Sequence, residues 1–318
     1  MPEQLVARLT DRAKPIPKGK DEKVPASKAT ARNKVNWSGL IWFPGALSFV
    51  LLVLPQFAFL EASFHADIGL GQVAHTYSLD NYVRVLADPF YLWSIWQTFY
   101  LSATATAFSL MLAVPTAYTL ARAGGNTASL WLNVILATSL ITVVIKLMGL
   151  NIIFGQVGPI NEALRWLGLV DRSLPFVNNE IGVLIGLVQY TLPILILLLF
   201  GVVQTIPSHL EEAAEVHGAK RATIFFSIIV PLLRNGLISG GLIAFNMSMG
   251  AFTSAVLMGG GRVLIMPVLI QQHIIQRAEY GTGAALAAVL LVFVFAINVG
   301  TGVFLMRSER KRAARAMN

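Results

Sequence analysis

The residues best suited to chemistry outside the apolar runs lie in one short acidic stretch between Ser208 and Gly218. Ser208 followed three residues later by Glu211 matches a capping box, and Gly218 suits a helix C′ position with positive φ. The stretch predicts a helix over 209–217 that lies outside the bilayer. Its small and acidic side chains would suit docking on another protein. The candidate residues are Glu211, Glu212, Ala213, Ala214, Glu215, His217 and Gly218.

The chain offers no catalytic constellation. It has no cysteine and no G-x-S-x-G nucleophile elbow, and its five histidines show no metal-ligand spacing. It also lacks the G-x-x-x-x-G-K-[ST] phosphate loop, so either a partner subunit or an ion gradient must supply energy. We therefore expect a protein that is not an enzyme and that holds no metal or cofactor of its own.

A second group of candidates lies inside the apolar runs. Lys146 is an ionisable residue within such a run, and an intramembrane charge is a functional candidate, although a lysine near the end of a span can snorkel. Polar side chains in spans either line a pathway or bond across helix interfaces. The predicted pathway residues are Lys146, Tyr190, Asn246, Ser248 and Thr253, drawn from a polar set that also includes Thr138, Thr142, Gln189 and Ser254.

Composition places the chain in a membrane. Of its 318 residues, 55% are hydrophobic and 13% are charged, with a mean hydropathy of +0.67, whereas soluble domains carry about 25% charge. The net charge of +8 would suit a nucleic-acid partner, but 14 of the 24 Lys and Arg residues lie in the two tails. The positive-inside rule explains such tails as cytosolic ends, so we expect no nucleic acid.

The apolar runs predict an all-α protein with six membrane spans, each long enough for a hydrocarbon core of about 30 Å. The spans are expected at about 40–62, 93–120, 130–154, 181–203, 228–257 and 283–306. Residues 1–37 read as a basic, disordered cytosolic tail, 38–306 as the transmembrane domain, and 307–318 as a second basic cytosolic tail. An even number of crossings places both termini and the loop 205–231 inside the cell.

One spacing in this loop resembles a known family. Glu212-Ala213-Ala214, three residues, Gly218, nine residues and then 228–231 (Ile-Ile-Val-Pro) resembles the EAA loop of importer permeases, whose pattern ends in I-x-L-P. These are the membrane subunits of binding-protein-dependent ABC transporters. Further stretches resemble the first permease subunit of spermidine/putrescine-type importers; they include 81–90, 115–122, 252–260 and 280–284.

The resemblance implies a fold, partners and a location. In the family, the EAA loop folds as a coupling helix that docks in a cleft of a cytosolic ATPase, which binds the ATP and Mg. The implied partners are a second permease subunit, two cytosolic ATPase subunits, a periplasmic or lipid-anchored solute-binding protein, a small-molecule cargo and the lipid bilayer. The implied location is the bacterial inner membrane, and the implied mechanism is alternating access.

The cargo does not follow from the resemblance. A polyamine or related amine is the first expectation; a phosphonate or opine is the alternative, since Lys146 would suit an anionic cargo, and ferric iron is third. A gradient-driven secondary transporter is the alternative from another class. It would need carboxylates inside the spans, where the sequence places none; Glu61 and Glu180 fall at span edges.

Two substitutions test the coupling assignment. Glu212→Lys reverses a charge on the docking helix, and Gly218→Val puts a β-branched side chain where positive φ is expected. Each variant should abolish uptake while membrane insertion stays intact, as measured by transport and membrane-fraction assays in cells. Normal transport by both variants would contradict the assignment.

Overall fold

The computed structural model describes residues 37–69 and 71–316. The predicted tail up to residue 36 lies outside the described residues. By internal contacts the chain divides into residues 1–52 and 53–318, and the packing below lies within the second unit. Helix α2 (Trp37–Ala62) is the first apolar helix. Within the described residues, five helices are long and apolar enough to cross a membrane, or six when one bent pair is counted as a span.

The polar segment after α2 contains a small sheet that the sequence does not predict. Strands β1 (His65–Gly69) and β2 (Gln72–Tyr77) form an irregular antiparallel hairpin, followed by helix α3 (Asp80–Ala87). The next helix, α4, starts sharply because Asp88 caps it, its side chain accepting a hydrogen bond from Phe90 N at 2.9 Å. Pro89 occupies the first helical turn, where its missing N–H is no loss.

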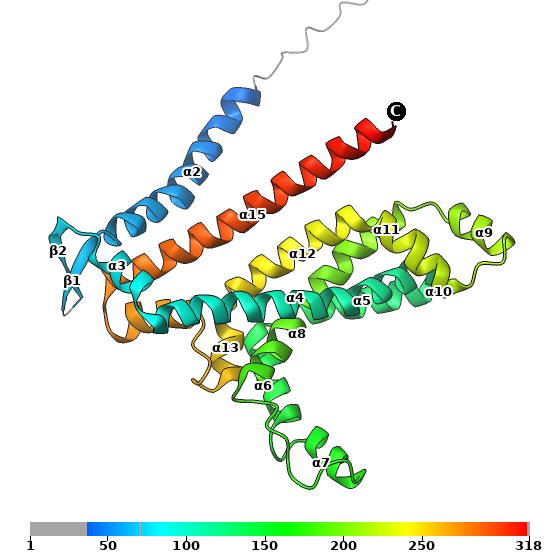
Figure 1. Ribbon diagram of the computed structural model, residues 1–318, viewed down its shortest axis with the longest axis horizontal. Coiled ribbons are helices and arrows are strands. Elements are labelled where there is room, and N and C mark those ends of the chain that lie inside the picture. Colours follow the sequence, from blue (N-terminus) through cyan, green and yellow to red (C-terminus); the bar gives the residue numbers. More distant parts are fainter. Residues whose placement is uncertain (1–36, 70, 317–318) are drawn as a thin grey trace, which may run out of the picture. The chain divides into compact units, whose positions relative to one another are not determined.

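The centre of the 53–318 unit is the pair formed by α4 (Pro89–Ala123) and α8 (Glu180–Gln204), with α12 (Arg234–Met249) packed on both (Figure 1). Leu101 and Leu187 are buried in one part of this bundle, and Ala117 and Leu199 in another. The hydroxyls of Ser109 and Thr191 share a 2.7 Å hydrogen bond between α4 and α8. As in other membrane bundles, small and hydroxyl side chains let the helices approach closely.

The predicted third span is not continuous. Helices α5 (Gly125–Leu140) and α6 (Val143–Phe154) are separated by Ile141 and Thr142, which have extended backbone conformations. A run of β-branched residues begins there, and such residues lose side-chain freedom in a helix. The candidate span runs from Val143 to Trp166, including helix α7 (Pro159–Trp166), and not over 130–154. Before α5, Gly124 and Gly125 have positive φ and make the predicted tight turn.

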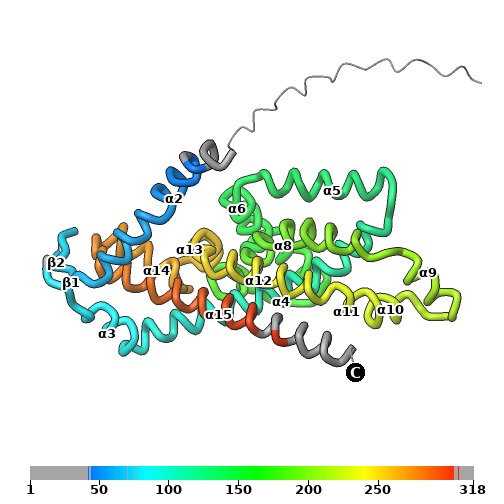
Figure 2. Tube along the Cα trace, turned by 90° about the horizontal axis from the view of Figure 1, so that it is seen from above, coloured from blue at the N-terminus to red at the C-terminus, as the bar shows by residue number. Residues whose placement is uncertain are grey.

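The prediction of one continuous helix for the fifth span, 228–257, is also wrong. Helices α10 (Arg221–Ile224) and α11 (Val230–Leu232), with the π-helical turn η1 (Phe225–Ile229) between them, meet α12 at a bend of 71°. A second break at Gly250 and Ala251 separates α12 from α13 (Phe252–Gly259). The tube in Figure 2 follows the chain through α10, α11, α12 and α13 in this order.

A short helix follows α13, as the sequence predicts, and leads to the last span. Helix α14 (Met266–Gln271) continues into the π-helical turn η2 (Gln272–Gln276), and α15 (Tyr280–Ala316) then runs on through the basic residues that follow the expected span. Asp67 of the hairpin accepts hydrogen bonds at the start of α15 from the backbone N–H groups of Gly281 and Thr282, at 2.8 and 2.9 Å, and from the Thr282 hydroxyl. A carboxylate is favourable at a helix N-terminus.

The contact between the hairpin and the start of α15 requires a glycine at position 281. A Cβ on Gly281 would lie 2.2 Å from the carbonyl oxygen of His65, whereas a Cβ on Gly300, in the same helix, would meet nothing within 4 Å. We expect Gly281→Ala to lower the free energy of unfolding by about 1–3 kcal/mol through overpacking. Gly300→Ala is the matched control and should leave stability unchanged or slightly raised.

Thermal unfolding of the purified chain in mild detergent measures both variants. Equal melting temperatures for Gly281→Ala and Gly300→Ala would contradict the close junction between the hairpin and α15.

Candidate coupling site

The predicted acidic helix is present as α9 (His209–Val216), one residue shorter than expected. His217 is its C-cap, and Gly218 follows with φ of 78°. The N–H of Gly218 donates to Glu215 O at 2.9 Å, and that of Ala219 donates to Ala214 O at 3.1 Å. These two bonds form a Schellman motif, which ends the helix and turns the chain back.

The predicted capping box is wrong. Ser208 has helical backbone angles and makes no side-chain cap hydrogen bond. Glu211 does not reach back to the helix start, because its carboxylate is bound to another element. One oxygen accepts a hydrogen bond from Arg122 Nε at 2.7 Å, and the other accepts one from the Tyr118 hydroxyl at 2.6 Å. Both partners lie on the last two turns of α4.

Arg122 connects three segments of the chain. Its Nη2 lies 2.6 Å from the Glu211 carboxylate and also donates to the carbonyl of Ile206 at 3.0 Å, just after α8. The side chains of Arg122 and Glu211 are 24% and 13% exposed, so solvent screens the pair only partly. The planar guanidinium fork makes these contacts at once, so the end of α4, the end of α8 and helix α9 are held together.

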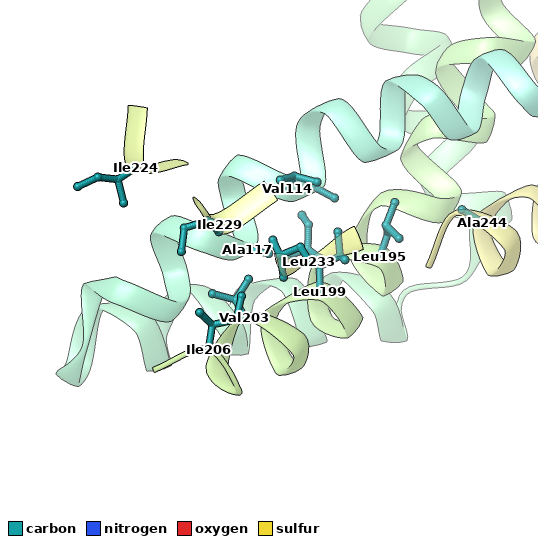
Figure 3. Packing of buried hydrophobic residues seen from close by; sticks show 12 residues of the cluster. Val114, Ala117, Leu195, Leu199, Val203, Ile206, Ile224, Ile229, Leu233 and Ala244 are labelled. Carbon is teal, nitrogen blue, oxygen red and sulfur yellow. The ribbon is translucent and has the colours of Figure 1, made fainter. Parts of the chain in front are cut away.

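Apolar packing supports the same arrangement (Figure 3). Ile224, Ile229 and Leu233, from the segment after α9, are buried in a cluster with residues of α4 and α8. Ala214 and Ala219 pack at the edge of this cluster, and the ring of Tyr118 lies 5.2 Å from that of Phe225. Burial of such side chains contributes about 1.5–3 kcal/mol each. The loop from α9 to α12 is therefore docked on the bundle.

The remaining surface of α9 is exposed in the part of the chain that the structure describes. Glu212, Ala213, Glu215 and His217 are exposed, and Val216 is 86% exposed. The sequence interpretation missed Val216, and it missed Tyr118 and Arg122 as partners because they lie some ninety positions earlier in the chain. It also placed both alanines of the EAA stretch toward a partner, whereas Ala214 packs against the chain's own core.

The predicted pathway residues do not form one site. Tyr190 and Thr253 line a cavity of about 120 Å³ near the break between α12 and α13. Asn246 lies elsewhere, exchanging two side-chain hydrogen bonds of 2.9 Å with Asn298 of α15. Ser248 is fully buried, and Lys146 is half-buried on α6.

Asn246 also lines a larger, apolar cavity of about 570 Å³ with residues of α2 and α15. Among the residues that the structure describes, no group of three or more His, Asp or Glu side chains is placed to hold a metal.

Comparison with known proteins decides the family. Residues 109–307 match the family described as "Binding-protein-dependent transport system inner membrane component". The chain belongs to this family. It is thus a permease subunit of an ABC importer, a transport protein and not an enzyme, and a multi-pass protein of the inner membrane. Membership implies work with a partner permease, an ATPase and a binding protein, which disfavours the gradient-driven alternative.

Curated relatives cover most of this permease. It is 30% identical to the spermidine/putrescine transport system permease protein PotB of Escherichia coli, over 76% of this chain and 88% of that protein. The sequence identity to PotB of Haemophilus influenzae is 29%, over 80% of this chain and 90% of that protein. The sequence identity is also 29% to the molybdenum transport system permease protein ModB of Mycobacterium tuberculosis, over 62% of this chain and 73% of that protein.

Solved structures share the fold of the permease. A chain of a bacterial alginate ABC transporter matches with a TM-score of 0.69, covering 83% of this chain and 92% of that one. A chain of the MetNI methionine ABC transporter matches with a TM-score of 0.52, covering 69% and 98%. Both are 16% identical in sequence, so this likeness concerns the fold alone.

The Glu211 contacts predict a difference between two neighbouring glutamates. Glu211→Gln removes the charge that Arg122 and Tyr118 share, so α9 should open more readily, by about 1–3 kcal/mol. Glu212→Gln is a matched control, because Glu212 is exposed. Hydrogen exchange of the amides in 210–219 should rise by about 5- to 150-fold in the first variant only. Equal exchange in both variants would show that the carboxylate does not hold the helix.

Proposed function

We propose that α9 is the coupling helix of this permease and that its exposed face docks on a cytosolic ATPase. The observation that carries the proposal is the division of the helix into two faces. Glu211 and Ala214 are committed to the chain itself, while Glu212, Ala213, Glu215 and His217 are exposed. An ATPase that holds the exposed face moves α4 and α8 with it, because Arg122 ties all three segments together.

The proposed assembly pairs this chain with a second permease, two ATPase subunits and a periplasmic or lipid-anchored binding protein. The two permeases enclose the pathway, and ATP and Mg bind in the ATPases. Both termini and α9 face the cytoplasm in this arrangement, with the β1–β2 hairpin outside. The basic residues that end α15 support this orientation. A partner can shift the alternating-access equilibrium only by its differential affinity for the two states, and α9 is where the ATPase applies that difference.

For the cargo we propose a polyamine or related amine, because several relatives at 29–30% identity are named for spermidine and putrescine. A second class, an anionic solute such as a phosphonate or opine, is favoured by the half-buried Lys146 on α6. A relative at 29% identity is named for molybdenum transport, so cargo varies at this level of similarity.

Purification of the chain from its native host in mild detergent tests the assembly. We expect a second permease and an ATPase to copurify, with ATP hydrolysis that rises when the accompanying binding protein is added. Glu212→Lys should copurify less ATPase than the wild type. Thr104→Val, a change at a half-buried position of α4 whose hydroxyl bonds within its own helix, should copurify the same amount. A chain that purifies without an ATPase would overturn the proposal.

A further inference from the structure

The apolar segment that contains α5, α6 and α7 is little covered by its own chain. Only 11% of the apolar window within Val143–Trp166 is buried, against 44% of the window in α4 and 39% of that in α8. The one buried side chain of α6 is Leu147, and α5 has none. Most of this segment therefore lacks a covering surface among the residues that the structure describes.

Two breaks interrupt the segment. Residues 141–142 are extended between α5 and α6, and residues 155–158 form a turn between α6 and α7. If the third span is 125–154, the first break lies inside it; if the span is Val143–Trp166, the second break does. Irregular backbone at membrane depth is tolerated only where protein buries it or where it lines a water-filled cavity. Lipid alone therefore cannot surround this segment.

The side chains around the breaks are apolar, so water is a poor surrounding as well. Leu140, beside the first break, and Val157, in the second, are each 87% exposed within this chain. Between the breaks, three exposed side chains follow one another at helical spacing along one side of α6. Contiguous apolar surface of this kind marks a contact with protein or membrane, and the breaks exclude lipid. These three residues, named the α6 stripe, are Ile145, Met148 and Ile152.

The position of the stripe is fixed by contacts within the chain. Leu147, on another side of α6, is fully buried in a cluster with Met258 of α13. The turn after α6 is closed by Asn161, which is fully buried. Its Nδ2 donates to the carbonyls of Gly155 at 2.9 Å and Leu174 at 3.1 Å, and its Oδ1 accepts from Leu174 N at 2.8 Å. The surface is therefore formed before any partner binds.

We propose that the α6 stripe, with Leu140 and Val157 at its two ends, is the surface on which the second permease packs. The ATPases of the importer are cytosolic and its binding protein lies outside, so a permease is the subunit that offers apolar helices at this depth. The surface rests on the proposed importer assembly and adds the residues that face the partner. A partner helix buries both the stripe and the irregular backbone beside it.

The experiment uses the copurified importer complex in lipid nanodiscs, with the photoreactive residue benzoylphenylalanine placed singly at position Leu140, Ile152 or Val292. Val292 on α15 is the matched control. It is 67% exposed, against 72% for Ile152, but α15 is unbroken, so lipid can cover it. After illumination, mass spectrometry should find positions 140 and 152 joined to peptides of the second permease and position 292 joined to none.

A second measurement changes the side chain less. The chain has no cysteine, so Ile152→Cys and Val292→Cys each carry a single thiol. Labelling by N-ethylmaleimide is compared between the chain alone and the complex in the same detergent. Labelling of Ile152→Cys should be lost in the complex, because the partner covers it, and labelling of Val292→Cys should be the same in both preparations.

Two outcomes would overturn the surface: crosslinks from positions 140 and 152 to lipid alone, or equal labelling of Ile152→Cys in the two preparations. The presence of a second permease in the preparation separates this proposal from the one on which it rests. If the second permease copurifies and these crosslinks are absent, the surface alone fails. If no second permease copurifies, the proposed assembly fails.

Discussion

The carboxylate of Glu211 is the contact on which the loop between α8 and α12 depends. It lies between the Tyr118 hydroxyl and the Arg122 guanidinium, and Arg122 in turn binds the chain just after α8. A partly buried carboxylate keeps its charge at low cost only when hydrogen bonds and an opposite charge surround it. The apolar cluster holds the loop against α4 and α8, and the charged contacts set the orientation of the loop on them.

Local signals in the sequence were enough for some features and not for others. The helix at 209–216 and the positive φ of Gly218 follow from residues a few positions apart, so they could be predicted. The partner of Glu211 lies on another helix, and a capping box was the plausible but wrong alternative. The breaks at 141–142 and 250–251 lie within continuous apolar runs, where hydropathy carries no information on backbone angles.

The predicted pathway residues show the same limit. Tyr190 and Thr253 lie on different spans and share a cavity, while Asn246, only seven residues before Thr253, lines a different one. The break between α12 and α13 separates them. Polar residues in a span can be recognised by composition, but which of them share a site depends on where the helix is interrupted.

The reciprocal amide pair of Asn246 and Asn298 has a consequence for the position of the last helix. Each amide supplies both a donor and an acceptor to the other, and in hydrocarbon neither finds water as a substitute. A slip of α15 by one residue, about 1.5 Å of rise and 100° of rotation, would break both of these bonds and leave Asn298 only its hydrogen bond to Val294 O in its own helix. The pair thus fixes the register of α15 against α12. The apolar faces of these two helices would tolerate several alignments, whereas both hydrogen bonds of the asparagine pair form in only one of them.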